Sequence, residues 1–138
     1  MEPHNAQECN PVDRQTISDF GVQWTHFPDP DSSGWFGGVN GQFKDQIEPL
    51  IHISEIKGMN VCDVGSGMGR VVRNLFEAGA ARVTAIEPSE AACSTLRANT
   101  REFEKRITLI CATGEHIPRN NFDLVITLVT NKFSLDRL

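Results

Sequence analysis

The pattern of apolar and polar residues differs between two parts of the chain. Residues 1–42 are rich in Pro, Gly, Asp and Ser, as in "FPDPDSSGWFGGVNGQ", and show no sustained periodicity, so we predict an irregular N-terminal segment that serves as a lid. From residue 43 the apolar positions become regular, and residues 43–138 are predicted to form one domain. The spacing in "FKDQIEPLIHISEI" is helical, but Pro49 predicts a kink or two short segments.

Short apolar runs then alternate with helical patterns. The runs of strand length are "MNVCDV", "RVTAIEP", "ITLICA" and "FDLVITLV". Between them, "RVVRNLFEAGA" predicts a helix that ends at Gly79, and "SEAACSTLRANTREF" predicts a helix with Ser89 as its N-cap. Strands that are apolar on both faces and alternate with helices predict an α/β fold, in which helices cover both faces of a parallel sheet.

Composition narrows the classes of protein. A chain of 138 residues, 39% of them apolar, can bury one core. The net charge of −5 is opposite in sign to the positive charge with which proteins bind nucleic-acid phosphates, so we expect no nucleic-acid partner. The start "MEPHNAQECN" lacks the apolar core of a signal peptide, and no stretch approaches the roughly 20 apolar residues of a membrane span. We therefore expect a cytoplasmic protein with no membrane partner.

The cysteines show no metal-site pattern. Cys9, Cys62, Cys93 and Cys111 form no CxxC pair and have no histidine at ligand spacing, so no metal is predicted. Cys62 and Cys111 fall inside apolar runs. We interpret both as small buried hydrophobic residues rather than as redox or metal-binding groups.

The stretch "NVCDVGSGMGR", residues 60–70, places a glycine turn between a predicted strand and a predicted helix. Such a turn lies where open parallel sheets bind their ligands, beyond the carboxyl ends of the strands. No lysine follows the glycines, which excludes a P-loop, and Arg70 stands where the dinucleotide fingerprint needs its third glycine. Asp63 would repel a pyrophosphate but would favour a cation or an amino group. We therefore expect a positively charged ligand.

From Asp63 onward the sequence reads acidic residue, any, Gly, any, Gly, any, Gly. This pattern resembles the first motif of the class I S-adenosylmethionine-dependent methyltransferases. The resemblance runs from about residue 43 to the C-terminus. It implies a Rossmann-like sheet with strand order 3-2-1-4, S-adenosyl-L-methionine as the cofactor, and a cofactor-binding turn that includes Gly65, Ser66, Gly67 and Gly69.

The resemblance implies further cofactor-binding residues. Glu87, 22 residues after Gly65, occupies the position of the acidic residue that accepts hydrogen bonds from both ribose hydroxyls, and Pro88 follows it. In "ATGEHIP" the adenine-contacting Asp of the family is replaced by Thr113, which we expect to be assisted by Gly114 and Glu115. An equally favoured alternative is that this threonine only caps a turn.

The resemblance assigns no catalytic residue. A sulfonium methyl group is already activated, so holding the acceptor in line and excluding water can suffice without a base. His52 and His116 are interpreted as structural or exposed residues. In the family, Asp123 corresponds to a structural residue at the start of the fourth strand.

The acceptor is predicted to be a small molecule. The Asn/Asp-Pro-Pro-aromatic motif of amide and adenine N-methyltransferases is absent from "TLVTNKFSLDRL". Trp24, Phe27, Trp35 and Phe36 resemble an aromatic entry segment over a small-molecule pocket, or they pack a lid onto the core.

The family's sheet has seven strands, with order 3-2-1-4-5-7-6, whereas this sequence ends soon after the fourth predicted strand. We therefore expect a sheet truncated before strands 5–7: either this chain is the cofactor-binding half of a longer protein, or a partner chain or an oligomer completes the sheet. Two alternatives stay open beside a methyltransferase. One is a non-catalytic module for cofactor binding or interaction, and the weaker one is an NAD-dependent oxidoreductase.

Overall fold

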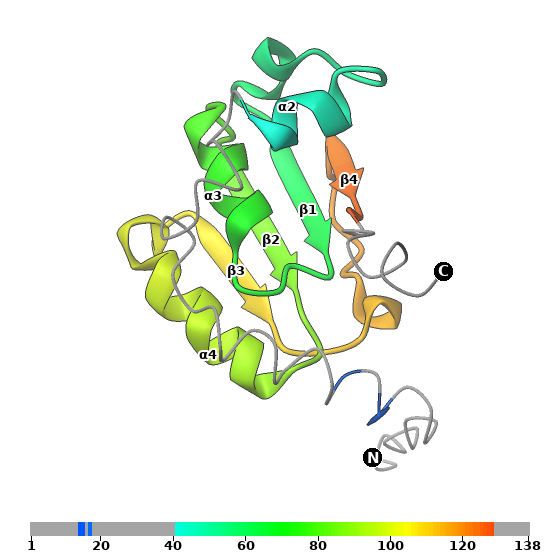
Figure 1. Cartoon of the computed structure of the whole chain (residues 1–138), viewed down its shortest axis with the longest axis vertical. Coiled ribbons are helices and arrows are strands. Elements are labelled where there is room, and N and C mark those ends of the chain that lie inside the picture. The colour runs from blue at the N-terminus through cyan, green and yellow to red at the C-terminus, as the bar shows by residue number, and fades with distance from the viewer. Residues whose placement is uncertain (1–13, 16, 18–40, 129–138) are drawn as a thin grey trace, which may run out of the picture.

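The computed structural model describes residues 14, 15, 17 and 41–128. In this part of the chain four parallel strands form one sheet in the order β3-β2-β1-β4 (Figure 1). The strands are β1 (Asn60–Val64), β2 (Arg82–Ile86), β3 (Ile107–Ile110) and β4 (Leu124–Ile126). The predicted α/β class and strand order are confirmed.

The helices follow the predicted pattern with shorter ends. Pro49 separates two short segments, as expected, because it lies between α2 and η1. Ser89 caps α4 by accepting a hydrogen bond from the Ala92 N–H at 3.3 Å. The helical elements are α2 (Gln42–Ile47), η1 (Ile53–Ile56), α3 (Arg70–Glu77), α4 (Glu90–Asn99), η2 (Arg101–Phe103) and η3 (Gly114–His116).

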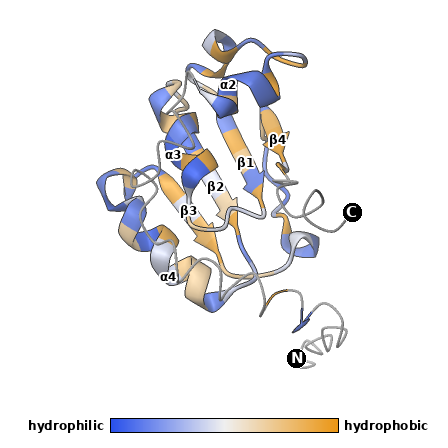
Figure 2. Ribbon diagram, in the orientation of Figure 1, coloured by the Kyte–Doolittle hydropathy of each residue, from blue (hydrophilic) through white to orange (hydrophobic). Residues whose placement is uncertain are grey.

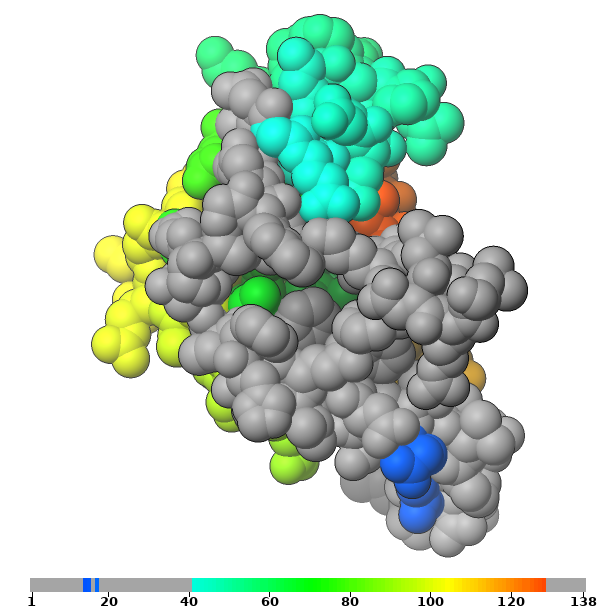
Figure 3. All heavy atoms as spheres, viewed as in Figure 1, coloured from blue at the N-terminus to red at the C-terminus, as the bar shows by residue number. Residues whose placement is uncertain are grey.

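One face of the sheet carries the apolar core. Val61 of β1 pairs in register with Val83 of β2 and Leu124 of β4, so these side chains share a face. Against this face pack apolar residues of α2, α3 and α4, among them Phe43, Ile47, Val72, Leu75 and Leu96. Figure 2 shows the apolar strands beneath helices that mix polar and apolar residues. In the space-filling view, α2 lies at the top of the molecule and the residues that follow α4 lie on its left side (Figure 3).

The opposite face of the sheet is less covered at β4. Val125, which shares this face with Cys62, is 53% exposed. The three α-helices of the described residues pack on the core face, and the helices predicted for the opposite face are not among the described residues.

Asp123 has the predicted structural role at the start of β4. Its Oδ2 accepts a hydrogen bond from the Asn60 N–H at 2.8 Å, and its own N–H donates to the Asn60 carbonyl at 2.8 Å. This pair of bonds fixes the register of β4 beside β1 and therefore the position of the strand ends at the site.

Candidate functional site

The turn after β1 depends on glycine. Gly65, Gly67 and Gly69 have φ angles of +79°, +54° and +96°, which side chains other than glycine rarely adopt. The N–H groups of Gly65 and Ser66 both donate to the Ile86 carbonyl, at 2.8 and 3.1 Å. The turn is therefore held against the carboxyl end of β2.

Two of these glycines differ in what surrounds them. A Cβ atom on Gly65 would meet nothing within 4 Å, whereas one on Gly69 would lie 3.3 Å from Leu96 Cγ and from Thr100 Cγ2. Gly65 therefore leaves space in front of the turn for a ligand. Gly69 instead allows the start of α3 to pack closely on α4.

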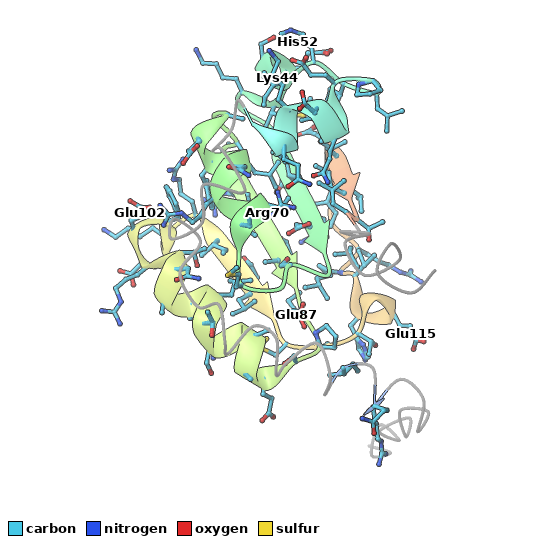
Figure 4. All side chains as sticks on the ribbon, viewed as in Figure 1. Lys44, His52, Arg70, Glu87, Glu102 and Glu115 are labelled. Atoms are coloured by element: carbon cyan, nitrogen blue, oxygen red, sulfur yellow. A yellow bond between two sulfur atoms is a disulfide. The ribbon has the colours of Figure 1, made fainter. Side chains whose placement is uncertain are left out.

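Glu87 follows β2 and joins two turns. Its carboxylate is 6% exposed; Oε2 accepts a hydrogen bond from the Gly67 N–H at 2.8 Å, and Oε1 accepts one from the Ser89 N–H at 2.9 Å (Figure 4). A carboxylate oxygen can accept two hydrogen bonds, so each oxygen retains one acceptor position. The carboxylate is thus oriented by the backbone and can still bind two hydroxyl groups.

Asp63 is a buried carboxylate without a full set of partners. It is 1% exposed, and within the described residues its Oδ2 accepts no hydrogen bond. Burial raises the pKa of this carboxyl to about 6, against the lowering influence of Ser66 and Arg70, and Glu87 adds a smaller upward effect. Burial also lowers the pKa of Arg70, which Asp63 counteracts. A buried carboxylate oxygen with no donor is suited to a cationic ligand group.

A pocket of about 500 Å³ opens at the carboxyl ends of the strands. Predicted site residues that line it come from three separate segments of the chain: Gly65, Pro88, Thr113, Gly114 and Glu115. Asp63, Ser66, Gly67, Gly69 and Glu87 do not line it; they form the turn and the strand ends beside it.

Four pocket residues were not predicted: Ile17, Val64, Ile86 and Thr127. Val64 and Ile86 are the last residues of β1 and β2, directly before the predicted Gly65 and Glu87. Their position at strand ends was the signal that could have identified them. Ile17 carries no comparable signal, because only the folded chain brings it to the pocket.

Thr113 does not cap η3. It occupies the N-cap position, but its side chain makes no capping hydrogen bond. Its Oγ1 instead lies 3.2 Å from Nδ1 of His116. The loop also packs closely on β1, because a Cβ atom on Gly114 would lie 3.0 Å from Val64 Cγ1. The turn-capping alternative for Thr113 is therefore wrong.

The cysteine predictions are half correct. Cys62 lies in β1 and is fully buried, as expected. The prediction for Cys111 was wrong, because β3 ends at Ile110 and Cys111 is exposed and forms a disulfide with Cys93. The spacing of the cysteines in the sequence does not indicate the Cys93–Cys111 pair, because only the packing of α4 beside β3 brings the two residues together.

His52 is a structural residue. Its side chain accepts a hydrogen bond from the Ser54 N–H at 3.3 Å, and its own N–H donates to Glu55 Oε2 at 2.8 Å, which together cap η1. The predicted aromatic segment with Trp24, Phe27, Trp35 and Phe36 lies outside the described residues. In the part of the chain that the structure describes, no helix has the length and apolar character to cross a bilayer.

A parallel sheet of order 3-2-1-4, with a glycine turn after β1 and acidic residues at the ends of β1 and β2, defines the Rossmann-like methyltransferase class. The chain belongs to the methyltransferase domain family, whose sequence profile matches residues 61–137. A comparison with curated protein sequences found no significant match.

Solved methyltransferase structures share this fold. A Mesorhizobium loti S-adenosylmethionine-dependent methyltransferase is 27% identical with a TM-score of 0.54, over 65% of this chain and 41% of that one. Magnesium protoporphyrin IX methyltransferase from Synechocystis PCC 6803, solved with bound SAM, is 16% identical with a TM-score of 0.63, over 91% of this chain and 65% of that one. Arabidopsis thaliana protein arginine methyltransferase 10 is 19% identical with a TM-score of 0.59, over 81% of this chain and 31% of that one. The chain thus spans less than two thirds of each of these proteins.

Proposed function

We propose that this chain binds S-adenosyl-L-methionine and forms the cofactor-binding part of a methyltransferase with a small-molecule acceptor. The observation that carries the proposal is the buried Oδ2 of Asp63, which accepts no hydrogen bond within the described residues and lies at the end of β1, where the glycine turn begins. The ammonium group of the methionine part fits this oxygen, directly or through one water, because it supplies both a positive charge and donors.

Glu87 binds the ribose in this proposal. Its two oxygens are held by the N–H groups of Gly67 and Ser89, and each oxygen retains an acceptor position for one of the two adjacent hydroxyls. The carboxylate is therefore preorganised, and cofactor binding requires little reorientation of this side chain.

Thr113 binds the adenine amine in this proposal. When His116 Nδ1 is an unprotonated acceptor, the Thr113 hydroxyl donates to it over 3.2 Å, and the lone pairs of the hydroxyl oxygen face a donor. Pro88, Gly114 and Glu115 complete the walls around the base. A threonine–histidine pair thereby replaces the aspartate of the family pattern.

The protein's part in methyl transfer is mainly positional. When bound, S-adenosyl-L-methionine supplies a sulfonium methyl group already activated for transfer. Asp63 would hold the methionine part of the cofactor and Glu87 its ribose, and an oriented cofactor would limit the directions from which an acceptor can approach. Because the sulfonium methyl group is already activated, the transfer does not require a base, and no described residue is assigned that role.

A small-molecule acceptor is supported by the net charge of −5, which disfavours RNA and DNA, and by the absence of the Pro-Pro-aromatic motif after β4. A second candidate is a module that binds the cofactor without transferring the methyl group.

Calorimetric titration with S-adenosylmethionine, S-adenosylhomocysteine and NAD tests the cofactor proposal. We expect both sulfur nucleosides to bind and NAD not to bind. Binding of NAD alone would contradict the proposal and support an oxidoreductase. Transfer of a labelled methyl group to a panel of small-molecule amines, phenols and carboxylates, with RNA and protein as comparison acceptors, then separates the methyltransferase from the silent module.

A further inference from the structure

A disulfide joins two elements beside the pocket. Cys93, in the first turns of α4, is bonded to Cys111, the residue after β3, and the two are 18 positions apart in the sequence. Cys93 is 1% exposed, whereas Cys111 is exposed. The bond therefore ties the buried side of α4 to the segment that leaves β3.

Both ends of the disulfide lead directly to residues proposed to bind the cofactor. After Cys111, only Ala112 precedes Thr113, which lines the pocket. On the other side, the Cys93 N–H donates to the Ser89 carbonyl at 2.8 Å, and the Ser89 N–H donates to Glu87 Oε1 at 2.9 Å. The disulfide thus connects the adenine side of the pocket to the ribose side.

The loop of residues 112–116 depends on this connection. Its main-chain hydrogen bonds within the described residues are local: the Ala112 N–H donates to the Ile110 carbonyl at 3.1 Å, and the His116 N–H donates to the Thr113 carbonyl at 3.0 Å. Local bonds shape the loop but do not fix its distance from α4. Loss of the disulfide therefore increases the conformational freedom of the loop.

The reduced cysteines also have partners in place. Cys93 Sγ lies 3.2 Å from the Glu87 carbonyl oxygen, to which a thiol can donate. Cys111 Sγ lies 4.0 Å from Arg97 Nη2, and a nearby guanidinium stabilises a thiolate. Each reduced sulfur therefore has a suitable polar neighbour in the fold.

We propose that the Cys93–Cys111 disulfide is a redox control on cofactor binding. In the oxidised protein the disulfide holds Thr113, Gly114 and Glu115 in position for adenine, and in the reduced protein the freed loop must be ordered by the cofactor. This inference rests on the proposed function, because it concerns the same pocket. Bonds of this kind in reducing compartments are commonly transient and sense redox state.

The exchange partner is a dithiol. One thiolate of the dithiol attacks the exposed sulfur of Cys111, the protein disulfide breaks, and Cys93 leaves as a thiolate that takes up a proton. The second thiol of the dithiol then attacks the mixed disulfide and releases Cys111. In total, two electrons and two protons pass from the dithiol to the protein, and a disulfide oxidant reverses the reaction.

The test compares binding of S-adenosylhomocysteine to the full chain oxidised with glutathione disulfide and reduced with dithiothreitol. We expect reduction to weaken binding roughly three- to tenfold, the cost of ordering a few loop side chains. Cys111→Ser should bind as the reduced protein does under both conditions, and Cys9→Ser should respond as the wild type does. Equal affinity in both states of the wild type would overturn this inference alone. No binding in either state would overturn the proposed function, and this inference with it.

A ligand-free measurement tests the disulfide itself. Alkylation of the oxidised protein, followed by peptide mass spectrometry, should find Cys93 and Cys111 in one linked peptide pair, and dithiothreitol should make both available to the alkylating reagent. If both thiols are alkylated in the presence of glutathione disulfide, the proposed control does not exist, whatever the ligand does.

Discussion

The N–H of Gly67 donates a hydrogen bond to Oε2 of Glu87 over 2.8 Å, so the acidic residue after β2 holds the glycine turn that follows β1. The residue proposed to bind the ribose is therefore also a structural part of the turn. The other oxygen holds the Ser89 N–H, at the start of α4. Function and stability are thus coupled at this side chain.

Glu87→Gln is expected to weaken both binding and folding. An amide keeps one acceptor oxygen but turns an NH₂ group toward either Gly67 or Ser89, whose N–H then loses its acceptor. We expect a loss of about 1–3 kcal/mol in the free energy of unfolding, and a similar loss in binding of S-adenosylhomocysteine. Urea unfolding measures the change in stability, and calorimetric titration measures the change in affinity for S-adenosylhomocysteine. Glu104→Gln, at an exposed position, is the matched control, and equal behaviour of the two variants would contradict the role of Glu87.

Asp63→Asn is expected to stabilise the ligand-free protein at neutral pH. Burial raises the pKa of Asp63 to about 6, above the value of about 3.9 in an unfolded chain, so the folded state favours the protonated form. The protonated Asp63 therefore contributes about 3 kcal/mol to the free energy of unfolding. This contribution is fully present below about pH 4 and is lost as the pH rises through about 6.

Urea unfolding of the wild type and of Asp63→Asn at pH 4 and pH 7.5 measures this effect. The variant should exceed the wild type by about 1–3 kcal/mol at pH 7.5 and equal it at pH 4. The exposed Asp45→Asn should show no such gain. A variant less stable than the wild type at pH 7.5 would show that the ionised carboxylate is satisfied in the ligand-free fold.

Cofactor affinity should rise with pH around the pKa of Asp63. The ammonium group of the ligand needs the ionised carboxylate, so the affinity of the wild type for S-adenosylhomocysteine should fall below pH 6, by up to about tenfold per pH unit. Binding near pH 6 should release a proton, which makes the measured enthalpy depend on the buffer. Asp63→Asn should bind S-adenosylhomocysteine more weakly than the wild type at pH 7.5, and its affinity should not change with pH around 6. If the variant keeps the pH dependence, another group is responsible for it.

Gly65→Ala and Gly69→Ala should distinguish the role of Gly65 in leaving space for a ligand from the role of Gly69 in helix packing. Both positions have positive φ, so each variant should lose about 1–2 kcal/mol of stability from backbone strain. Gly69→Ala also places its methyl group 3.3 Å from Leu96 and Thr100 and should have the lower melting temperature. Gly65→Ala meets no protein atom within 4 Å and should show the larger loss of cofactor affinity. The reverse order would contradict the assignment of Gly65 to the ligand space.

Thr113→Val tests recognition of the adenine amine. The substitution keeps the shape of the side chain but removes the hydroxyl, and we expect binding of S-adenosylhomocysteine to weaken by about 0.5–1.5 kcal/mol. S-inosylhomocysteine, which has a carbonyl in place of the amine, should bind the variant and the wild type alike. Thr95→Val, in which the lost hydroxyl donates a hydrogen bond to the Ala91 carbonyl of its own helix, provides the control. An equal loss for both ligands would indicate a packing effect instead.

Local signals in the sequence predict the helices and strands, and the strand ends at which the site forms. The spacing of apolar residues placed the two helices that follow Arg70 and Ser89, and Pro49 separated α2 from η1, because these signals are local. Asp63 was found because it stands at the end of an apolar strand, directly before a glycine turn at the ligand-binding edge of a parallel sheet. Glu87 was found through the resemblance to the second motif of the methyltransferase family.

The contacts between side chains in and around the site depend on tertiary packing. The bond between Glu87 and Gly67, the pair formed by Thr113 and His116, and the disulfide between Cys93 and Cys111 depend on how turns and helices pack, which no periodicity encodes. The burial of Asp63 belongs to the same group, because it is the packed fold, and not the strand pattern, that removes water from its carboxylate and raises its pKa.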